Sequence, residues 1–561
     1  METEEILRKL DMIFRDILKN ENITLTPETT AKDVDGWDSL TNMRLITAIE
    51  KHYNIRFGLR EILKFKHVGD LCASIQAKKN YPMMFLSLPF VILFTCCLIL
   101  YYTVKGSYQK PVLLLTSCIF VGYFNIAYLL IAALIAAITF YWGRWIGMQE
   151  QENKRRRVFV GGIVFLVLFL VAFKYLNFIG ENIAVLLGWF GVDWKGAITS
   201  VFFPLGISFY TFQALGYLID VYWEEEEPER SLPDFMLYML FFMKFLSGPI
   251  ERAFDMLPQL KIEKRFDYDT VTYGLKLMMI GLMKKVLIAD RLAPHLDSIF
   301  ASVQDASGAQ LLLAGLLYPI ELYADFSGYT DMAIGGAMMF GYRLSPNFNR
   351  PFVAKTITDF WRRWHMSLSF WVRDYLYQPI AASKRYWGQW SIVYALVVTF
   401  VLLGVWHGAG WNYVIYGLIQ GLIISYEMVT VAYRNKVETS VGKHVFGVYS
   451  ILRTYLLFAF SLLFFRLPSL SDAGYMISHL SFNLHTSIKE LRLGMTDQEC
   501  IVAGVAVVVL FLYEYFMSKR DLLQALSERH RIIRWGVYYL LVLLMFLFGQ
   551  FGSEDFIYLQ F

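Results

Sequence analysis

The stretch WSIVYALVVTFVLLGVWHG, residues 390–408, decides the class of fold. It has no charged side chain before His407, and it is nearly as long as the ~20 residues with which an α-helix crosses a hydrocarbon core. Runs of similar character occur at Pro82–Tyr102, Val158–Tyr175, Cys500–Tyr513 and Trp535–Phe548. The sequence therefore predicts a polytopic, all-α membrane protein.

The composition of the whole chain agrees with this class. Of its 561 residues, 56% are hydrophobic and 18% are charged, whereas a typical soluble domain has about 25% charged residues. Judged by the length of the apolar runs, we expect about eleven membrane helices, with membrane lipids around them. The net charge of +4 is too small to indicate a nucleic-acid partner.

The positions of the basic residues and the cysteines bear on location and redox chemistry. The segment Asn153–Arg157 is the strongest marker of a cytoplasmic loop. Met1–Lys79 is polar and amphipathic rather than a signal peptide, so we expect the N-terminus on the cytoplasmic side of the cytoplasmic membrane. The five scattered cysteines show neither disulfide nor metal-ligand spacing, and no metal site is predicted.

The stretch from Asn347 to Tyr386 departs from simple membrane spanning. It mixes many Lys, Arg and Asp residues with Trp, Phe and Tyr. Such a segment is too charged to cross lipid and too aromatic for a free loop. We therefore expect helices that lie at the membrane interface or re-enter a cavity lined by protein.

Residues 1–80 predict a small domain of four helices, followed by the membrane domain 81–561. Ile6, Leu10, Ile13 and Ile17 recur at steps of four, three and four, which indicates one amphipathic helix. A second helix starts near Ser39 and places Leu40, Met43, Ile46 and Ile49 on one side. A short turn at Glu61–Phe65 and a helix from about Val68 to Ala77 complete the domain.

Ser39 follows a loop containing Gly36 and opens an amphipathic helix. A helix N-terminus stabilises a phosphate group on such a hydroxyl through its N–H groups and its dipole. Alternatively, Ser39 serves only as the helix cap. With Asp38 and Leu40 on either side, the domain resembles an acyl or peptidyl carrier domain. The resemblance implies 4′-phosphopantetheine on Ser39, attached by a phosphopantetheinyl transferase and loaded by an acyl-activating ligase.

His407 and His365 are the candidate catalytic residues of the membrane domain. An ionisable side chain at the end of an apolar run is costly and suggests function, although a structural histidine bonded to a neighbouring helix is the alternative. Transfer from a thioester to an alcohol needs a base near neutrality, and histidine suits that task. His365 lies in the charged, aromatic stretch, where it would polarise the carbonyl oxygen or orient the substrate.

The membrane domain resembles the membrane-bound O-acyltransferase family over nearly all of Pro82–Phe561. The matching stretches are Phe203–Tyr210, Ser247–Arg252, Asp325–Asp331, Asn347–Phe352, Phe360–Tyr377 and Gly404–Gly408. The resemblance implies that His407 is the catalytic histidine and His365 the second histidine of the site. It also implies a ring of tilted helices around a thinned centre, with a tunnel joining the two faces.

Two bacterial branches of that family fit, one that D-alanylates teichoic acids and one that O-acetylates exported polysaccharides. The acceptor is then an extracytoplasmic hydroxyl or an acyl-relay protein. A lysophospholipid or a protein hydroxyl is the alternative acceptor. A transporter or scaffold is the alternative from a different class, since broken helices and intramembrane charges occur there too.

Acidic residues in apolar surroundings complete the picture. If this segment is helical, Glu321 and Asp325 share one face at i, i+4, and Gly328 is expected to interrupt that pattern before Asp331. We expect these carboxylates to line the tunnel or, more simply, to form structural pairs with Arg350, Arg362 or Arg363.

Overall fold

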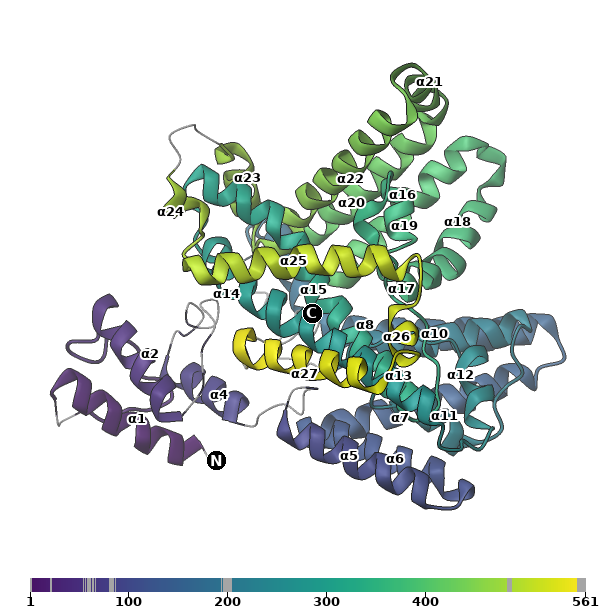
Figure 1. The fold of residues 1–561 in the computed structure, drawn as a ribbon, viewed down its shortest axis with the longest axis horizontal. Helices are drawn as coiled ribbons and strands as arrows, with labels where there is room; N and C mark the ends of the chain where they lie inside the picture. The colour runs from purple at the N-terminus through teal and green to yellow at the C-terminus, as the bar shows by residue number, and fades with distance from the viewer. Residues whose placement is uncertain are drawn as a thin grey trace. The chain divides into compact units, whose positions relative to one another are not determined.

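The computed structural model describes the chain apart from residues 1–2, 21–22, 54, 56, 58–61, 63–64, 66, 80–84, 86, 193, 195–203, 482–486 and 552–561. The described residues form helices and loops without a strand, which confirms the all-α fold (Figure 1). They fall into two compact units, residues 1–93 and 94–551. The domain boundary expected between residues 80 and 81 stays a prediction.

The first unit contains α1 (Thr3–Leu18), α2 (Ser39–Tyr53) and α4 (Val68–Lys79). Its core is made by Ile6, Leu10 and Phe14 from α1 with residues of α2 and α4, which confirms an amphipathic first helix. Ile13 and Ile17, which were expected in the stripe, are only partly buried. The short turn expected at Glu61–Phe65 lies mostly outside the described residues.

The second unit starts within α5 (Leu88–Thr103) and continues to α27. Its first half comprises α6 (Gly106–Phe124), α7 (Ile126–Gly147), α8 (Glu152–Lys174), α9 (Leu176–Trp189), α10 (Ile207–Trp223), α11 (Leu232–Leu240), α12 (Ala253–Leu260), α13 (Tyr268–Lys284), η1 (Lys285–Ala289), α14 (Asp290–Ala301) and α15 (Gly308–Met339).

The second half of the unit begins with short elements: η2 (Pro351–Val353), α16 (Ile357–Trp361), α17 (Met366–Val372), η3 (Arg373–Tyr377), α18 (Gln378–Ser383) and η4 (Arg385–Trp387). Longer helices follow: α19 (Gln389–His407), α20 (Trp411–Val429), α21 (Val431–Val441), α22 (Lys443–Arg466), α23 (Leu470–His479), α24 (Ile488–Leu491), α25 (Asp497–Met517), α26 (Leu522–Ser527) and α27 (Arg531–Phe548).

Six helices among the described residues are long and apolar enough to cross a membrane: α7, α8, α19, α22, α25 and α27. The number rises to seven if α20 and α21, bent by 67° at their junction, are one broken span. The expected count of about eleven is therefore not confirmed. The difference arises partly because helices such as α10 and α15 are buried by protein along most of their length and carry polar residues.

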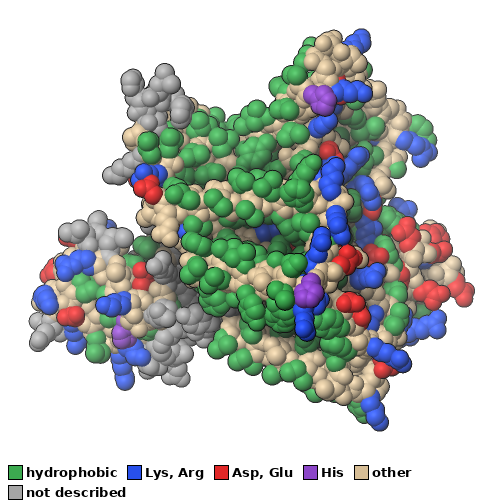
Figure 2. All heavy atoms as spheres, in the orientation of Figure 1, with side chains coloured by type: hydrophobic (Ala, Val, Ile, Leu, Met, Phe, Trp, Pro, Cys, Tyr) green, Lys and Arg blue, Asp and Glu red, His purple; other side chains and the backbone are tan. Residues whose placement is uncertain are grey.

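The outer surface of the second unit supports insertion in lipid. α25 and α27 bury only small parts of their apolar windows in the protein, 11% and 6%. Figure 2 shows hydrophobic side chains covering the visible faces of these helices, with Lys and Arg gathered where α25 ends and α27 begins. Such wide exposure of Val, Ile and Leu is unfavourable in water and suits a bilayer.

The segment 347–386 is a series of short helices, as expected for a stretch that does not span. Its aromatic residues Phe360, Trp361, Trp364, Trp371 and Tyr375 are buried in protein. These aromatic residues pack against helices of the second unit. The segment therefore lies against protein, and its charged residues need not face lipid.

Two helix pairs bring the centre of the domain together by close backbone contact. A Cβ atom on Gly281 of α13 would lie 2.4 Å from the carbonyl oxygen of Gly328 on α15. A Cβ atom on Gly404 of α19 would lie 3.0 Å from Gly417 of α20. Glycine at these positions lets two backbones approach, as in other membrane helix pairs. Gly328 thus packs within the continuous helix α15, which confirms that Glu321 and Asp325 lie on a helix.

Candidate active site

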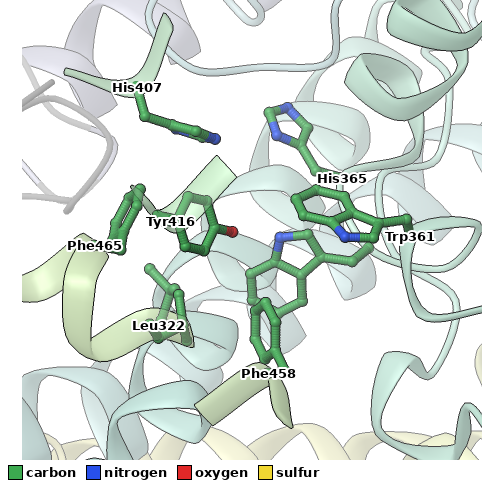
Figure 3. Close-up of a pocket in the computed structure, with 9 residues that line it drawn as sticks. Leu322, Trp361, His365, His407, Tyr416, Phe458 and Phe465 are labelled. Atoms are coloured by element: carbon green, nitrogen blue, oxygen red, sulfur yellow. The ribbon is translucent and has the colours of Figure 1, made fainter. Parts of the chain in front are cut away.

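His365 and His407 lie in one enclosed cavity of the second unit (Figure 3). Both are buried, with 1% and 4% of their surface exposed. The cavity has a volume of about 10 Å³, room for roughly one water molecule. Its remaining lining is aromatic and aliphatic: Leu322, Trp361, Trp364, Tyr416, Phe458, Leu462 and Phe465. The structure therefore brings together the two histidines that the sequence singled out.

His407 is the last residue of α19. Its ring packs against Trp406 at 4.7 Å and Phe465 at 5.1 Å between centroids. After it the chain turns sharply into α20, which lies against α19 along the glycine contact described above. In Figure 3 the imidazole projects from the helix end towards the space shared with His365 and Tyr416.

The carbonyl groups that end α19 are held by two residues at the end of α8. Lys174 Nζ donates to the Trp406 carbonyl at 2.5 Å and to Ser208 Oγ at 3.4 Å. Tyr175 OH donates to the Val405 carbonyl at 2.8 Å. No carboxylate among the described residues forms an ion pair with Lys174, so neutral groups stabilise its charge. These hydrogen bonds fix the last turn of α19, which carries His407.

His365 lies between the short helices α16 and α17, outside the spanning helices. Its φ of +44° is in the left-handed region, which a non-glycine residue rarely adopts. Asn347 stabilises this turn, because its carbonyl accepts from Met366 N at 2.9 Å and its side chain accepts from Ser367 N at 3.1 Å. Burial lowers the pKa of His365 to about 3, so the imidazole is neutral near pH 7.

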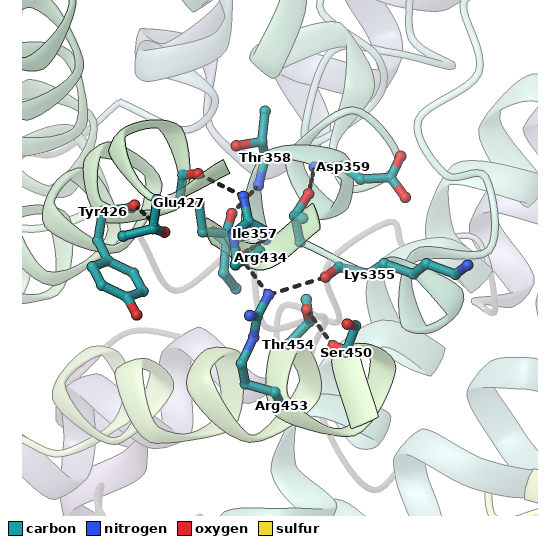
Figure 4. Close-up of polar contacts among 12 residues, drawn as sticks. Lys355, Ile357, Thr358, Asp359, Tyr426, Glu427, Arg434, Ser450, Arg453 and Thr454 are labelled. Atoms are coloured by element: carbon teal, nitrogen blue, oxygen red, sulfur yellow. Dashed lines mark hydrogen bonds and ion pairs between the residues drawn. The ribbon is translucent and has the colours of Figure 1, made fainter. Parts of the chain in front are cut away.

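A buried carboxylate anchors the segment that leads to His365 (Figure 4). Glu427 on α20 accepts from the backbone N–H groups of Ile357 and Thr358 at the start of α16, at 3.1 and 3.3 Å. It also pairs with Arg453 of α22 at 3.1 Å, and Arg453 donates to the Lys355 carbonyl. Glu427 thereby joins α16, α20 and α22 beneath the aromatic wall of the cavity.

Sequence reasoning missed Lys174, Tyr175 and Glu427. A signal was present for two of them: Lys174 ends the apolar run Val158–Tyr175, and Glu427 interrupts the apolar helix 411–429. A charge at such a position is costly in a membrane and suggests a specific partner. The sequence could not name that partner.

Two acidic residues of α15, Asp325 and Asp331, pair with two neighbouring lysines. Lys285 Nζ lies 2.7 Å from Asp325 and 2.8 Å from Asp290. Asp331 pairs with Lys284 at 2.8 Å. These pairs use lysines at the junction of α13 and η1 in place of the expected Arg350, Arg362 or Arg363. The expectation that Asp325 forms a structural ion pair is confirmed.

The candidate carrier site lies at the start of α2 in the first unit. Ser39 and Leu40 open this helix, but their side chains lie outside the described part of the structure. Asp38 is exposed, and its carboxylate accepts from Thr41 N at 2.8 Å. Asp38 therefore acts as the cap of α2. Trp37 fixes the preceding loop, because its ring lies 4.8 Å from Phe14 and its Nε1 donates to Asn42.

These features fit a phosphate ester on residue 39. The first turn of a 15-residue helix is exposed at Asp38, its entry loop is packed, and its cap is already supplied by a neighbour. The N–H groups and the dipole at the start of this helix favour an anion there.

Comparisons with known proteins agree with both parts. Residues 224–467 match the family described as MBOAT, membrane-bound O-acyltransferase family, and residues 8–75 match the family described as phosphopantetheine attachment site. The chain is 37% identical to the probable alginate O-acetylase of Azotobacter vinelandii, over 62% of this chain and 68% of the relative. It is 34% identical to the peptidoglycan O-acetyltransferase of Helicobacter pylori, over 58% and 65% of the two chains. It is 32% identical to the teichoic acid D-alanyltransferase of Bacillus subtilis, over 39% and 58%.

Proposed function

The chain belongs to the membrane-bound O-acyltransferase family and is an acyltransferase, and we propose that it moves an acyl group from a carrier thioester within its own chain to a hydroxyl group. The acceptor is an exported cell-envelope polysaccharide or a teichoic acid, reached directly or through an extracytoplasmic acyl-relay protein. The transporter or scaffold alternative does not agree with the family.

One observation carries this proposal: two buried histidines from separate segments face one cavity in a chain that also has a phosphopantetheine attachment domain. A cavity with a neutral imidazole at its wall suits proton removal from an alcohol. A carrier domain supplies the other reactant. A lysophospholipid or a protein hydroxyl remains the second candidate acceptor, because the described lining does not distinguish alcohols.

In the proposed mechanism, His407 accepts the proton of the acceptor hydroxyl as that oxygen attacks the acyl carbonyl carbon. His365 is on the opposite wall, where its N–H donates to the developing oxyanion or orients the attacking oxygen. Trp361, Trp364 and Phe465 surround the reacting atoms with apolar surface. The proton held by His407 then passes to the leaving thiolate, which closes the proton balance.

The carrier domain extends over residues 1–80 and the acyltransferase domain over 81–561. Ser39 would bear the 4′-phosphopantetheine, with Asp38 and Leu40 flanking it, as the family model over residues 8–75 supports. When bound, this group supplies a thiol that carries the acyl chain. A phosphopantetheinyl transferase and an acyl-activating ligase are the partners that such a domain requires.

The protein is an integral membrane protein, and we place it in the cytoplasmic membrane with the carrier domain on the cytoplasmic side, where activating ligases have ATP. Cysteine substitution of exposed Lys32 in intact cells tests the side. Labelling by a membrane-impermeant maleimide only after the membrane is permeabilised agrees with the placement, and labelling of intact cells contradicts it. The natural cysteines are replaced first, because Cys96 is also exposed.

Three variants of the full chain test the function. Ser39→Ala should abolish loading, read as the mass of phosphopantetheine on the intact protein. His407→Ala should retain loading and lose transfer to the acceptor. His365→Gln should retain loading and lower transfer. Transfer at the wild-type rate in Ser39→Ala or His407→Ala would refute the assigned role of that residue.

A further inference from the structure

A second pocket lies at the end of the membrane unit where α5 and α15 end and α13 begins. Its volume is about 240 Å³, against about 10 Å³ for the cavity of the histidines. It is remote from the histidines, because Leu322 lines their cavity while Met338 lines this pocket. These two residues are about 24 Å apart along α15 at 1.5 Å per residue. The acyl-transfer mechanism does not use this pocket.

The pocket gathers three cations around a small space. Lys264, Arg265 and Arg343 line it, with one carboxylate, Asp267. That carboxylate is engaged, because it accepts from Thr270 N at 2.9 Å and so caps α13. Burial, and after it the charge of Arg343, lower the pKa of Lys264. The lining thus holds three cations and one carboxylate, a net charge of +2, which favours an anionic ligand.

The exposed apolar residues that alternate in sequence with the charged ones are called the rim here, and one of them, Phe266, lies 5.2 Å from the ring of Tyr102 in the pocket wall. Ile262, Phe266 and Tyr268 are 62%, 58% and 61% exposed beside the charged residues. Tyr102 and Tyr342 form part of the wall, and Lys264 Nζ lies 5.1 Å from the Tyr342 ring. Aromatic side chains prefer the depth of the bilayer interface. A free anion gains nothing from such a rim, whereas a phospholipid uses both the cations and the apolar surface.

The same end of the unit carries other basic residues, which places the pocket near headgroups. Gln109, at the start of α6, donates to the Lys264 carbonyl at 2.7 Å. Lys110 of the same helix pairs with Asp234. α7 ends at this side too. A Cβ atom on its last residue, Gly147, would meet Pro228, and Pro228 lies only six residues before Asp234, the partner of Lys110. The basic segment Asn153–Arg157 follows α7 directly.

We propose that this pocket binds the headgroup of one anionic phospholipid, with Arg265, Arg343 and Lys264 on the phosphate and the exposed aromatic residues against the acyl chains. Phosphatidylglycerol carries the net negative charge that the site needs. Phosphatidylcholine has the same phosphate but a compensating cation, which the cluster repels.

The test compares the lipid retained by the purified full chain in native mass spectrometry. Detergent-solubilised protein is mixed with phosphatidylglycerol, phosphatidylcholine or inorganic phosphate. The double variant Arg265→Gln/Arg343→Gln is paired with Arg156→Gln/Arg157→Gln, which removes the same charge from exposed residues outside the pocket. At about 1 kcal/mol per basic residue near a lipid surface, loss of two cations should weaken phosphatidylglycerol binding roughly 30-fold.

The proposal expects one retained phosphatidylglycerol in the wild type and in the control variant, and its loss in the pocket variant. Equal retention of phosphatidylcholine by the wild type would overturn it without any variant. An equal loss in both variants would assign binding to general surface charge. An increase in melting temperature with inorganic phosphate as large as that with phosphatidylglycerol would make the ligand a free anion instead. Since both arginines are exposed, the pocket variant is expected to fold.

Discussion

Replacement of Lys174 by methionine tests whether the hydrogen bonds to the last carbonyl groups of α19 position the imidazole of His407. Methionine keeps an unbranched apolar stem and removes the ammonium, so the bonds to the Trp406 carbonyl and to Ser208 are lost. A hydrogen bond to a charged group contributes about 1.5–3 kcal/mol. If the loss of these bonds raises the activation free energy of transfer by that amount, because His407 is no longer held in place, kcat falls roughly 10- to 150-fold.

Stability should respond differently from activity. Lys174 ends a spanning helix, and a lysine near the membrane interior costs free energy that methionine does not. That gain offsets the lost hydrogen bonds, so we expect the melting temperature to stay equal or to increase. A variant that is stable and slow would separate positioning from folding.

The assay is single-turnover transfer from the loaded full chain to the acceptor, followed by intact-protein mass spectrometry. Loading should be normal, the KM for the acceptor should change little, and kcat should decrease. Lys174→Arg keeps the cation and should recover most of the rate, while Tyr175→Phe removes the bond to Val405 and should lower kcat about tenfold or less. Wild-type kcat in the methionine variant, or failure of arginine to recover any activity, would refute the reasoning.

Three further predictions concern stability. Glu427→Ala removes the buried carboxylate that accepts from Ile357 N and pairs with the partly buried Arg453, and should cost about 1–3 kcal/mol, seen as a lower melting temperature with reduced transfer; an unchanged melting temperature would show that the contact is not structural. Gly281→Ala forces a methyl group against a backbone carbonyl and should cost about 1–3 kcal/mol, while Gly504→Ala, with nothing within 4 Å, should be neutral. Asp38→Ala removes the cap of α2 and about 1 kcal/mol, so deuterium exchange in its first turn should rise roughly fivefold, and equal exchange would speak against the cap.

The class of fold was readable from the chain because the hydrophobic pattern is strong and local. Runs such as 390–408 and the stripe through Ile6 and Leu10 depend on neighbours in sequence, and the structure has helices at both places. The number of spans was not readable in the same way. Buried helices such as α10 and α15 satisfy their polar groups within protein, so apolar length does not decide whether they cross lipid.

The convergence of His365 and His407 came from the resemblance to a family, since no local period joins two segments that the chain brings together only on folding. The ion pair of Asp325 shows the same limit. The sequence correctly indicated that this carboxylate needs a partner, but it offered the nearby arginines. The π-helix η1 instead rotates Lys285 onto α15, and such a change of helical register leaves no clear trace in composition.

Gly328 shows how one residue type predicts opposite structures. Glycine weakens an isolated helix, which favours a break. Here a neighbouring helix compensates, because Gly281 and Gly328 allow the two backbones to touch. Only the partner helix, which lies elsewhere in the sequence, decides between these outcomes.

The small size of the cavity between the two histidines affects how much of the acyl donor is lost to hydrolysis. With room for roughly one water molecule, this cavity is smaller than a thioester and an acceptor hydroxyl together. We therefore expect its aromatic walls to separate when both reactants bind and to leave little space for solvent beside them. A carrier domain loaded with an acyl group should therefore keep that group for a long time when no acceptor is present, because hydrolysis of the thioester at this site should be slow.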